Sequence, residues 1–183
     1  NPFMDKFSSI DHKLNSTCFS IGIFPGSRLP EIIDNLISIL EVLEAMSDLK
    51  YFKNVEFNFA IVNALDKSRI IKLLHKRDWK YSEKIFRNNS MQFHNKFINI
   101  NIKWNYFEEI LIRSNCVISM AGTATEQAIG LAKPVIQIEG KGPQFTKSFA
   151  EAQRRLLGKY VFCATNYKNK KDQISKTIEL ILK

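Results

Sequence analysis

Hydrophobic positions follow two patterns that alternate along the chain. Short apolar runs predict six β-strands, at 18–24, 56–62, 97–101, 116–120, 134–138 and 160–164. Between these runs, apolar residues recur every three or four positions and predict helices at 32–46, 66–78, 105–114, 124–132, 146–157 and 169–182. Residues 79–96 mix aromatic and charged side chains without a clear period, so no element is assigned there.

Strands that alternate with helices are typical of parallel pairing through right-handed crossovers. We therefore predict an α/β fold, a Rossmann-like doubly wound parallel sheet of about six strands, in one domain at 17–183. Residues 1–16 are polar and irregular, and we interpret them as an interdomain linker or an entry segment. Ligands of such sheets bind at the carboxyl ends of the strands, so the loops at that edge are the candidates for function.

Composition and charge narrow the class of protein. The 183 residues are 45% hydrophobic, which is enough for one core, and no apolar run approaches the length of a membrane-spanning helix. Cys18, Cys116 and Cys163 are odd in number and far apart, which favours a reducing cytosol over a disulfide framework or a zinc site. The net charge of +9 permits nucleotides, nucleic acid or an anionic membrane as partners.

The densest basic stretch covers residues 67–84 and contains apolar residues at helical spacing. It predicts an amphipathic helix with a basic outer face. A solvated helix surface explains this pattern best, and contact with an anionic membrane is the second interpretation.

The first candidate loop, "FPGSR", follows the first predicted strand. Gly26 allows close backbone approach to a ligand, Ser27 can cap the next helix or donate to a phosphate, and Arg28 adds positive charge. The free N–H groups at the start of that helix would also face an anion. A capped turn with a surface arginine explains the loop equally well. No Walker or Gly-x-Gly-x-x-Gly motif is present.

The second loop, at 119–130, follows the fourth predicted strand. Gly122 again permits close approach, and Thr123 with Glu126 forms a capping-box pattern that would begin a helix. Gln127, one helical step further on, could direct its amide at a ribose or sugar hydroxyl.

The third loop, at 138–158, follows the fifth predicted strand and combines glycine, lysine and polar side chains, including Gln144, Thr146 and Gln153. Loops of this kind at one edge together predict an anionic, hydroxyl-rich ligand such as a nucleotide sugar.

The segments "FPGSRLPEI" and "NCVISMAGTATEQAIGLAKPVIQIEGKGPQFTKSFAEAQ" resemble the bacterial lipid-A-disaccharide synthase group, and more closely a related subgroup of those glycosyltransferases. The resemblance covers most of residues 18–158 and is weak at 50–100. It implies a GT-B architecture of two Rossmann-like domains, of which this chain would be the C-terminal, donor-binding half. The acceptor-binding N-terminal domain would be a partner outside this chain, and the "NPFMD" start resembles the family's junction between the two domains.

The resemblance also implies roles for individual residues. Gly26, Ser27 and Arg28 would hold the donor's diphosphate, and Gly122 and Thr123 would line the same cleft. Arg28 would stabilise the leaving group, and no catalytic base is expected in this chain. The reaction would transfer a sugar of the N-acetylhexosamine type from a UDP-sugar to a lipid or glycolipid acceptor. No metal or cofactor is expected. The location would be cytoplasmic, with peripheral contact with the inner face of the membrane as an additional option.

The resemblance also implies which residues contact the sugar and the nucleoside of the donor. Gln144 would reach the donor sugar, and the uracil would lie near Lys103 and Trp104. The family has a glutamate where this chain has Gln127, with an acid shifted by one place to Glu126. A glutamine has one accepting and one donating end, so it pairs with a ribose diol less strongly than a carboxylate does.

Three alternatives remain open from the sequence. A non-hydrolysing UDP-sugar 2-epimerase would need acidic and histidine residues in the cleft, where the loops offer only Glu126 and Glu139. A nucleic-acid binding module would fit the net charge of +9, but no RNA-binding signature is present, so nucleic acid is disfavoured as a partner. A degenerate donor domain kept for partner contact would fit Gln127.

Overall fold

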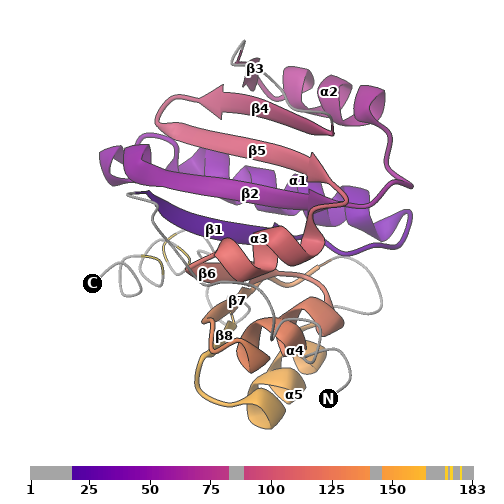
Figure 1. Cartoon of the computed structure of the whole chain (residues 1–183), viewed down its shortest axis with the longest axis vertical. Coiled ribbons are helices and arrows are strands. Elements are labelled where there is room, and N and C mark those ends of the chain that lie inside the picture. Colours follow the sequence, from indigo (N-terminus) through magenta and orange to yellow (C-terminus); the bar gives the residue numbers. More distant parts are fainter. Residues whose placement is uncertain are drawn as a thin grey trace.

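An open, mostly parallel β-sheet runs through the centre of the molecule (Figure 1). The computed structural model describes residues 18–82, 89–140 and 146–163, together with Asp172, Ile174 and Ile178. Within these residues the sheet has eight strands in the order β3-β4-β5-β2-β1-β6-β7-β8. The strands are β1 (Phe19–Phe24), β2 (Val55–Ile61), β3 (Lys80–Tyr81), β4 (Ser90–Asn95), β5 (Ile98–Trp104), β6 (Cys116–Ser119), β7 (Val135–Gln137) and β8 (Val161–Cys163).

The predicted α/β class and all six predicted strands are confirmed, and these six strands pair in parallel. The expected count of about six is wrong, because β3 and β4 extend the sheet by antiparallel pairing next to β5. Both extra strands fall within 79–96, the stretch without a clear period. Phe93 is the one fully buried side chain of β4, so hydrogen bonding to β5, rather than apolar alternation, defines this strand.

The helices connect successive strands, as the hydrophobic spacing predicts. They are α1 (Glu31–Met46), α2 (Lys67–Lys76), α3 (Phe107–Arg113), α4 (Gly122–Gly130) and α5 (Lys147–Leu157), with a short 3-10 helix η2 (Lys50–Asn54) before β2. The helix expected at 169–182 lies mostly outside the described residues. Its three described residues are helical, and Ile174 and Ile178 are buried. No helix in the described part of the chain could cross a membrane.

Helices cover both faces of the sheet, in a layering compatible with a Rossmann-like fold (Figure 1). Ile21 and Ile23 of β1 pack in the core cluster that contains the apolar stripe of α1, whereas Phe24 packs in a second cluster with α3 and α4. The chain moves from β1 through α1 to β2, and in the opposite direction along the sheet from β6 through α4 to β7. Right-handed crossovers in opposite directions place their helices on opposite faces.

A polar cluster fastens the end of α1 to the turn after α2. The Glu44 carboxylate accepts hydrogen bonds from Arg77 Nε at 2.8 Å, Arg77 Nη2 at 2.6 Å and Trp79 Nε1 at 2.8 Å. This contact raises the pKa of Arg77. Trp79 is fully buried, so its indole N–H needs this acceptor.

We predict that Glu44→Ala lowers the free energy of unfolding by about 2 kcal/mol, because it leaves a guanidinium and a buried indole N–H without their acceptor. Denaturant unfolding of the wild type and the variant measures this difference. Glu41→Ala is the matched control, since Glu41 is 59% exposed and lies 3.9 Å from Arg77 Nη2. We expect it to cost less than about 0.5 kcal/mol. Equal losses in both variants would contradict the assignment.

Candidate functional site

The carboxyl ends of β1 and β6 lie side by side at the point where the chain direction reverses. The two strands are parallel neighbours with Phe24 opposite Ser119, and the Met120 N–H donates to the Phe24 carbonyl at 2.9 Å. Beyond these residues the chain enters α1 on one face and α4 on the other. The Ser27 and Gly122 loops therefore share one edge of the sheet, at the switch point where ligands of such sheets bind.

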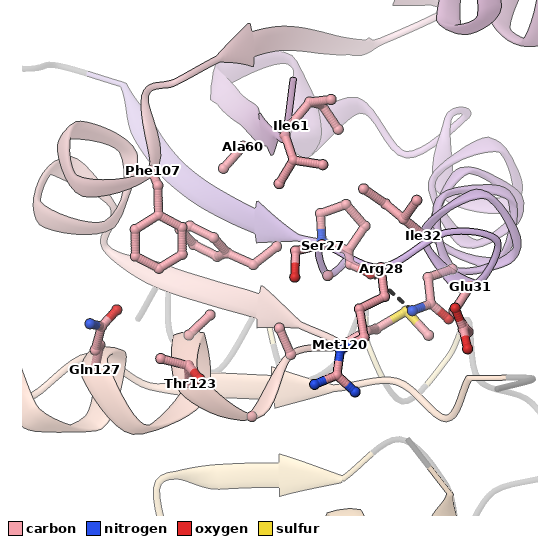
Figure 2. A pocket seen from close by; sticks show the side chains of 18 of the residues that line it. Ser27, Arg28, Glu31, Ile32, Ala60, Ile61, Phe107, Met120, Thr123 and Gln127 are labelled. Atoms are coloured by element: carbon pink, nitrogen blue, oxygen red, sulfur yellow. Dashed lines mark hydrogen bonds between the residues drawn. The ribbon is translucent and has the colours of Figure 1, made fainter. Parts of the chain in front are cut away.

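A pocket of about 920 Å³ opens between the two loops (Figure 2). The β1–α1 loop and the first turns of α1 form one wall, and the start of α4 forms another. The end of β2, Asn105, Phe107, Thr146 and Phe149 also line the pocket. Figure 2 shows Ala60, Ile61 and Phe107 on the apolar side of the space. A mostly apolar pocket with a few polar groups is typical of a small-molecule site.

Gly26 gives the β1–α1 loop its shape. Its φ of +105° lies in the left-handed region, where a side chain would be strained. The Asn35 amide fixes the preceding residue, because its Nδ2 donates to the Pro25 carbonyl at 2.9 Å. The glycine that the sequence suggested for close approach is therefore needed for the turn itself.

Ser27 and Arg28 line the pocket and are exposed. The expectation that Ser27 could cap the helix is wrong, because α1 begins at Glu31 with Pro30 as its N-cap and without a side-chain cap. The hydroxyl of Ser27 therefore stays outside the helix. Among the described lining residues only Arg28 and Glu31 are charged.

The second loop differs from its predicted capping pattern. Helix α4 begins at Gly122 rather than at 124, and its N-cap is Ala121, so Thr123 and Glu126 do not form a capping box. Thr125 instead donates through Oγ1 to the Ala121 carbonyl at 3.0 Å. Thr123 is exposed and lines the pocket, whereas Glu126 is exposed and is not among the lining residues.

The start of α4 is the better of the two helix ends for an anion. Its first turn contains no acidic side chain, whereas the first turn of α1 carries Glu31 and Asp34. Those carboxylates offset the partial positive charge at the start of α1. Gln153 of α5 supports the α4 end from behind, since its Nε2 contacts the Gly122 carbonyl at 3.5 Å and its Oε1 accepts from Gln137 at 2.6 Å.

Three buried oxygen atoms in the pocket have no hydrogen-bond partner within the described chain: Glu31 Oε2, Asn35 Oδ1 and Gln127 Oε1. Asn35 is 5% exposed and Gln127 is 9% exposed. A buried acceptor without a partner costs free energy, on the order of 1–3 kcal/mol. Because all three residues line the pocket, they are candidates for hydrogen bonding to a ligand.

Sequence reasoning identified Gln127 but missed Glu31 and Asn35. Asn35 lies beside Leu36 in the apolar stripe of α1, so a polar residue at a buried position was the available signal. Glu31 precedes it by one helical turn, and an acidic residue is common in the first turn of a helix, so the sequence carries no separate signal for it.

Thr146 of the third loop lines the pocket, whereas Lys103 and Trp104 do not. Trp104 is 3% exposed, and its indole N–H donates to the Leu65 carbonyl at 2.8 Å, so its ring belongs to the core. Lys103 places its ammonium 5.8 Å from the centre of the Tyr106 ring and is not among the lining residues. Gln144 lies outside the described residues.

No protein-family model matches the chain, and no curated protein is significantly similar to it. The functional inference therefore rests on the geometry of the pocket and on the sequence resemblance.

We predict that Gly26→Ala lowers the free energy of unfolding by about 1–2 kcal/mol, because alanine is strained at positive φ. Denaturant unfolding measures the loss. Gly130→Ala is the control, since Gly130 is an exposed residue at the end of α4 without positive φ, and we expect it to be neutral or stabilising. An unchanged stability of Gly26→Ala would argue against the turn geometry.

Proposed function

We propose that this chain is the donor-binding domain of a GT-B glycosyltransferase related to lipid-A-disaccharide synthase. Its donor would be a UDP-sugar, of the N-acetylhexosamine type, and its acceptor a lipid or glycolipid. The observation that supports this most directly is one pocket, at the switch point of the sheet, that combines two glycine-containing loops, Arg28 and buried acceptors without partners. The sequence resemblance supplies the choice of donor.

The diphosphate is best accommodated between Ser27, Arg28 and the start of α4. The guanidinium of Arg28 forms charge-assisted hydrogen bonds with phosphate oxygens, and the first N–H groups of α4 point out of the helix end. Ser27 adds a hydroxyl that is not used as a cap.

The ribose would lie at Gln127, in the second turn of α4. The unpartnered Oε1 can accept from one ribose hydroxyl, while the amide nitrogen can donate to the other. A neutral amide gives weaker hydrogen bonds than the glutamate of the related family does, so we expect lower affinity for the ribose and the same binding mode.

In this proposal the chain contributes to catalysis by stabilising the leaving group. The acceptor hydroxyl attacks the anomeric carbon, the bond from that carbon to the diphosphate oxygen breaks, and the electron pair leaves with UDP. Arg28 and the α4 amides are oriented before charge accumulates on that oxygen, so little reorganisation is needed during the reaction. The base that removes the acceptor's proton would come from the N-terminal domain.

The epimerase alternative is less well supported by the pocket. Glu31 is the one carboxylate among its described lining residues, and those residues include no histidine. Acid–base chemistry on both faces of a sugar carbon requires two positioned groups.

We predict that the chain binds UDP or UDP-sugars in preference to GDP, ADP and dTDP counterparts, as measured by calorimetry. Arg28→Ala should weaken UDP binding about tenfold or more, because it removes a charge-assisted contact to the diphosphate. Ser27→Ala should weaken it by a smaller factor.

Arg69→Ala is the matched control for charge, since Arg69 is exposed on α2 and does not line the pocket. It should leave UDP affinity nearly unchanged. Equal loss in the Arg28 and Arg69 variants would indicate nonspecific attraction to a basic surface. Indifference of the wild type to every nucleotide would refute the proposed function.

A further inference from the structure

We infer that Glu31 and Asn35 form a subsite for the donor sugar, in which their side-chain oxygens accept hydrogen bonds from sugar hydroxyls or an amide N–H. This inference rests on the proposed function. It assigns specificity for the sugar to the first turns of α1, on the side of the pocket away from Gln127.

The orientation of the Asn35 amide is fixed by the protein. Its Nδ2 donates to the Pro25 carbonyl at 2.9 Å, and exchanging the nitrogen and oxygen would bring two oxygens together. Oδ1 is therefore the atom left without a partner, on a side chain that is 5% exposed and lines the pocket. This position can take only a hydrogen-bond donor.

Glu31 adds a second acceptor directly beside it. Residues four apart on a helix lie on the same face, so Glu31 and Asn35 project into the pocket as neighbours. Glu31 Oε2 is buried and has no hydrogen-bond partner within the described chain. Two adjacent acceptors match a ligand group that carries two donors, as a sugar with neighbouring hydroxyls or with a hydroxyl and an acetamido N–H does.

The same pair excludes the charged part of the ligand. A diphosphate at neutral pH offers acceptors and negative charge, so it would be repelled by Glu31 and would leave Asn35 Oδ1 without a donor. Figure 2 shows Gln127 on one side of the pocket, Glu31 on the other, and Ser27 with Arg28 between them. A nucleotide sugar has its diphosphate in the middle, so with ribose at Gln127 the sugar lies at Glu31 and Asn35.

The test compares UDP with UDP-N-acetylglucosamine by calorimetry on the whole 183-residue chain. Glu31→Ala should lower the affinity for the sugar nucleotide about tenfold, because a hydrogen bond to a charged acceptor is lost. The same variant should leave UDP affinity unchanged or raise it, because a negative charge near the diphosphate is removed. A general loss of structure would instead lower the affinity for both ligands.

Asp34→Asn is the matched control. Asp34 belongs to the same first turn and carries the same charge, but it is exposed and is not among the lining residues. We expect it to leave the ratio of the two affinities unchanged. If Glu31→Ala does not fold, Glu31→Gln serves instead, and a smaller but selective loss for the sugar nucleotide is expected.

The outcomes separate the two proposals. If the wild type binds UDP but Glu31 variants do not change the ratio of affinities, the sugar subsite is wrong and the proposed function stands. If the wild type binds neither UDP nor the sugar nucleotide, the proposed function fails and the subsite fails with it.

Discussion

The parallel pairing of β1 with β6 is the constraint on which the site depends. Its register sets Phe24 opposite Ser119, so the two strands end at the same level of the sheet. The crossovers that follow run in opposite directions along the sheet, which places α1 and α4 on opposite faces. A crevice between the two loops is the geometric consequence of this arrangement. Gly22 helps to hold this arrangement, because a Cβ there would lie 2.5 Å from Ser114 Oγ at the end of α3.

The chemistry of the pocket comes from side chains placed on that frame. Arg28 and the start of α4 favour negative charge in the middle, whereas Glu31 and the amides of Asn35 and Gln127 offer acceptors without partners. No purely anionic ligand satisfies both parts, because phosphate oxygens cannot donate to the acceptors. A neutral polyol would leave the positive charge of Arg28 without a negative partner in the ligand. We therefore propose a ligand with a central diphosphate and hydroxyl-bearing groups on both sides, such as a nucleotide sugar, rather than a nucleotide alone.

Hydrophobic spacing predicted the six parallel strands and the connecting helices because each of these elements buries an apolar face. It could not predict β4, whose pairing with β5 is set by backbone hydrogen bonds while most of its side chains stay partly exposed. The Gly26 and Gly122 loops were recognisable because a glycine soon after a buried strand indicates a tight turn or a close approach of the backbone to a ligand. The predicted caps at Ser27 and Thr123 were wrong, because α1 and α4 have Pro30 and Ala121 as their N-caps, residues without a capping side chain. Trp104 was placed near a base by resemblance, but its burial against Leu65 follows from long-range packing that local sequence does not record.

Hydrogen–deuterium exchange of the chain with and without saturating UDP would show whether the nucleotide binds between the Ser27 and Gly122 loops. We expect slower exchange in the segments 24–35 and 119–127, which flank the pocket at the ends of β1 and β6, with little change in α2. Protection confined to the basic helix α2, or binding of UDP without any change in those two segments, would contradict this expectation.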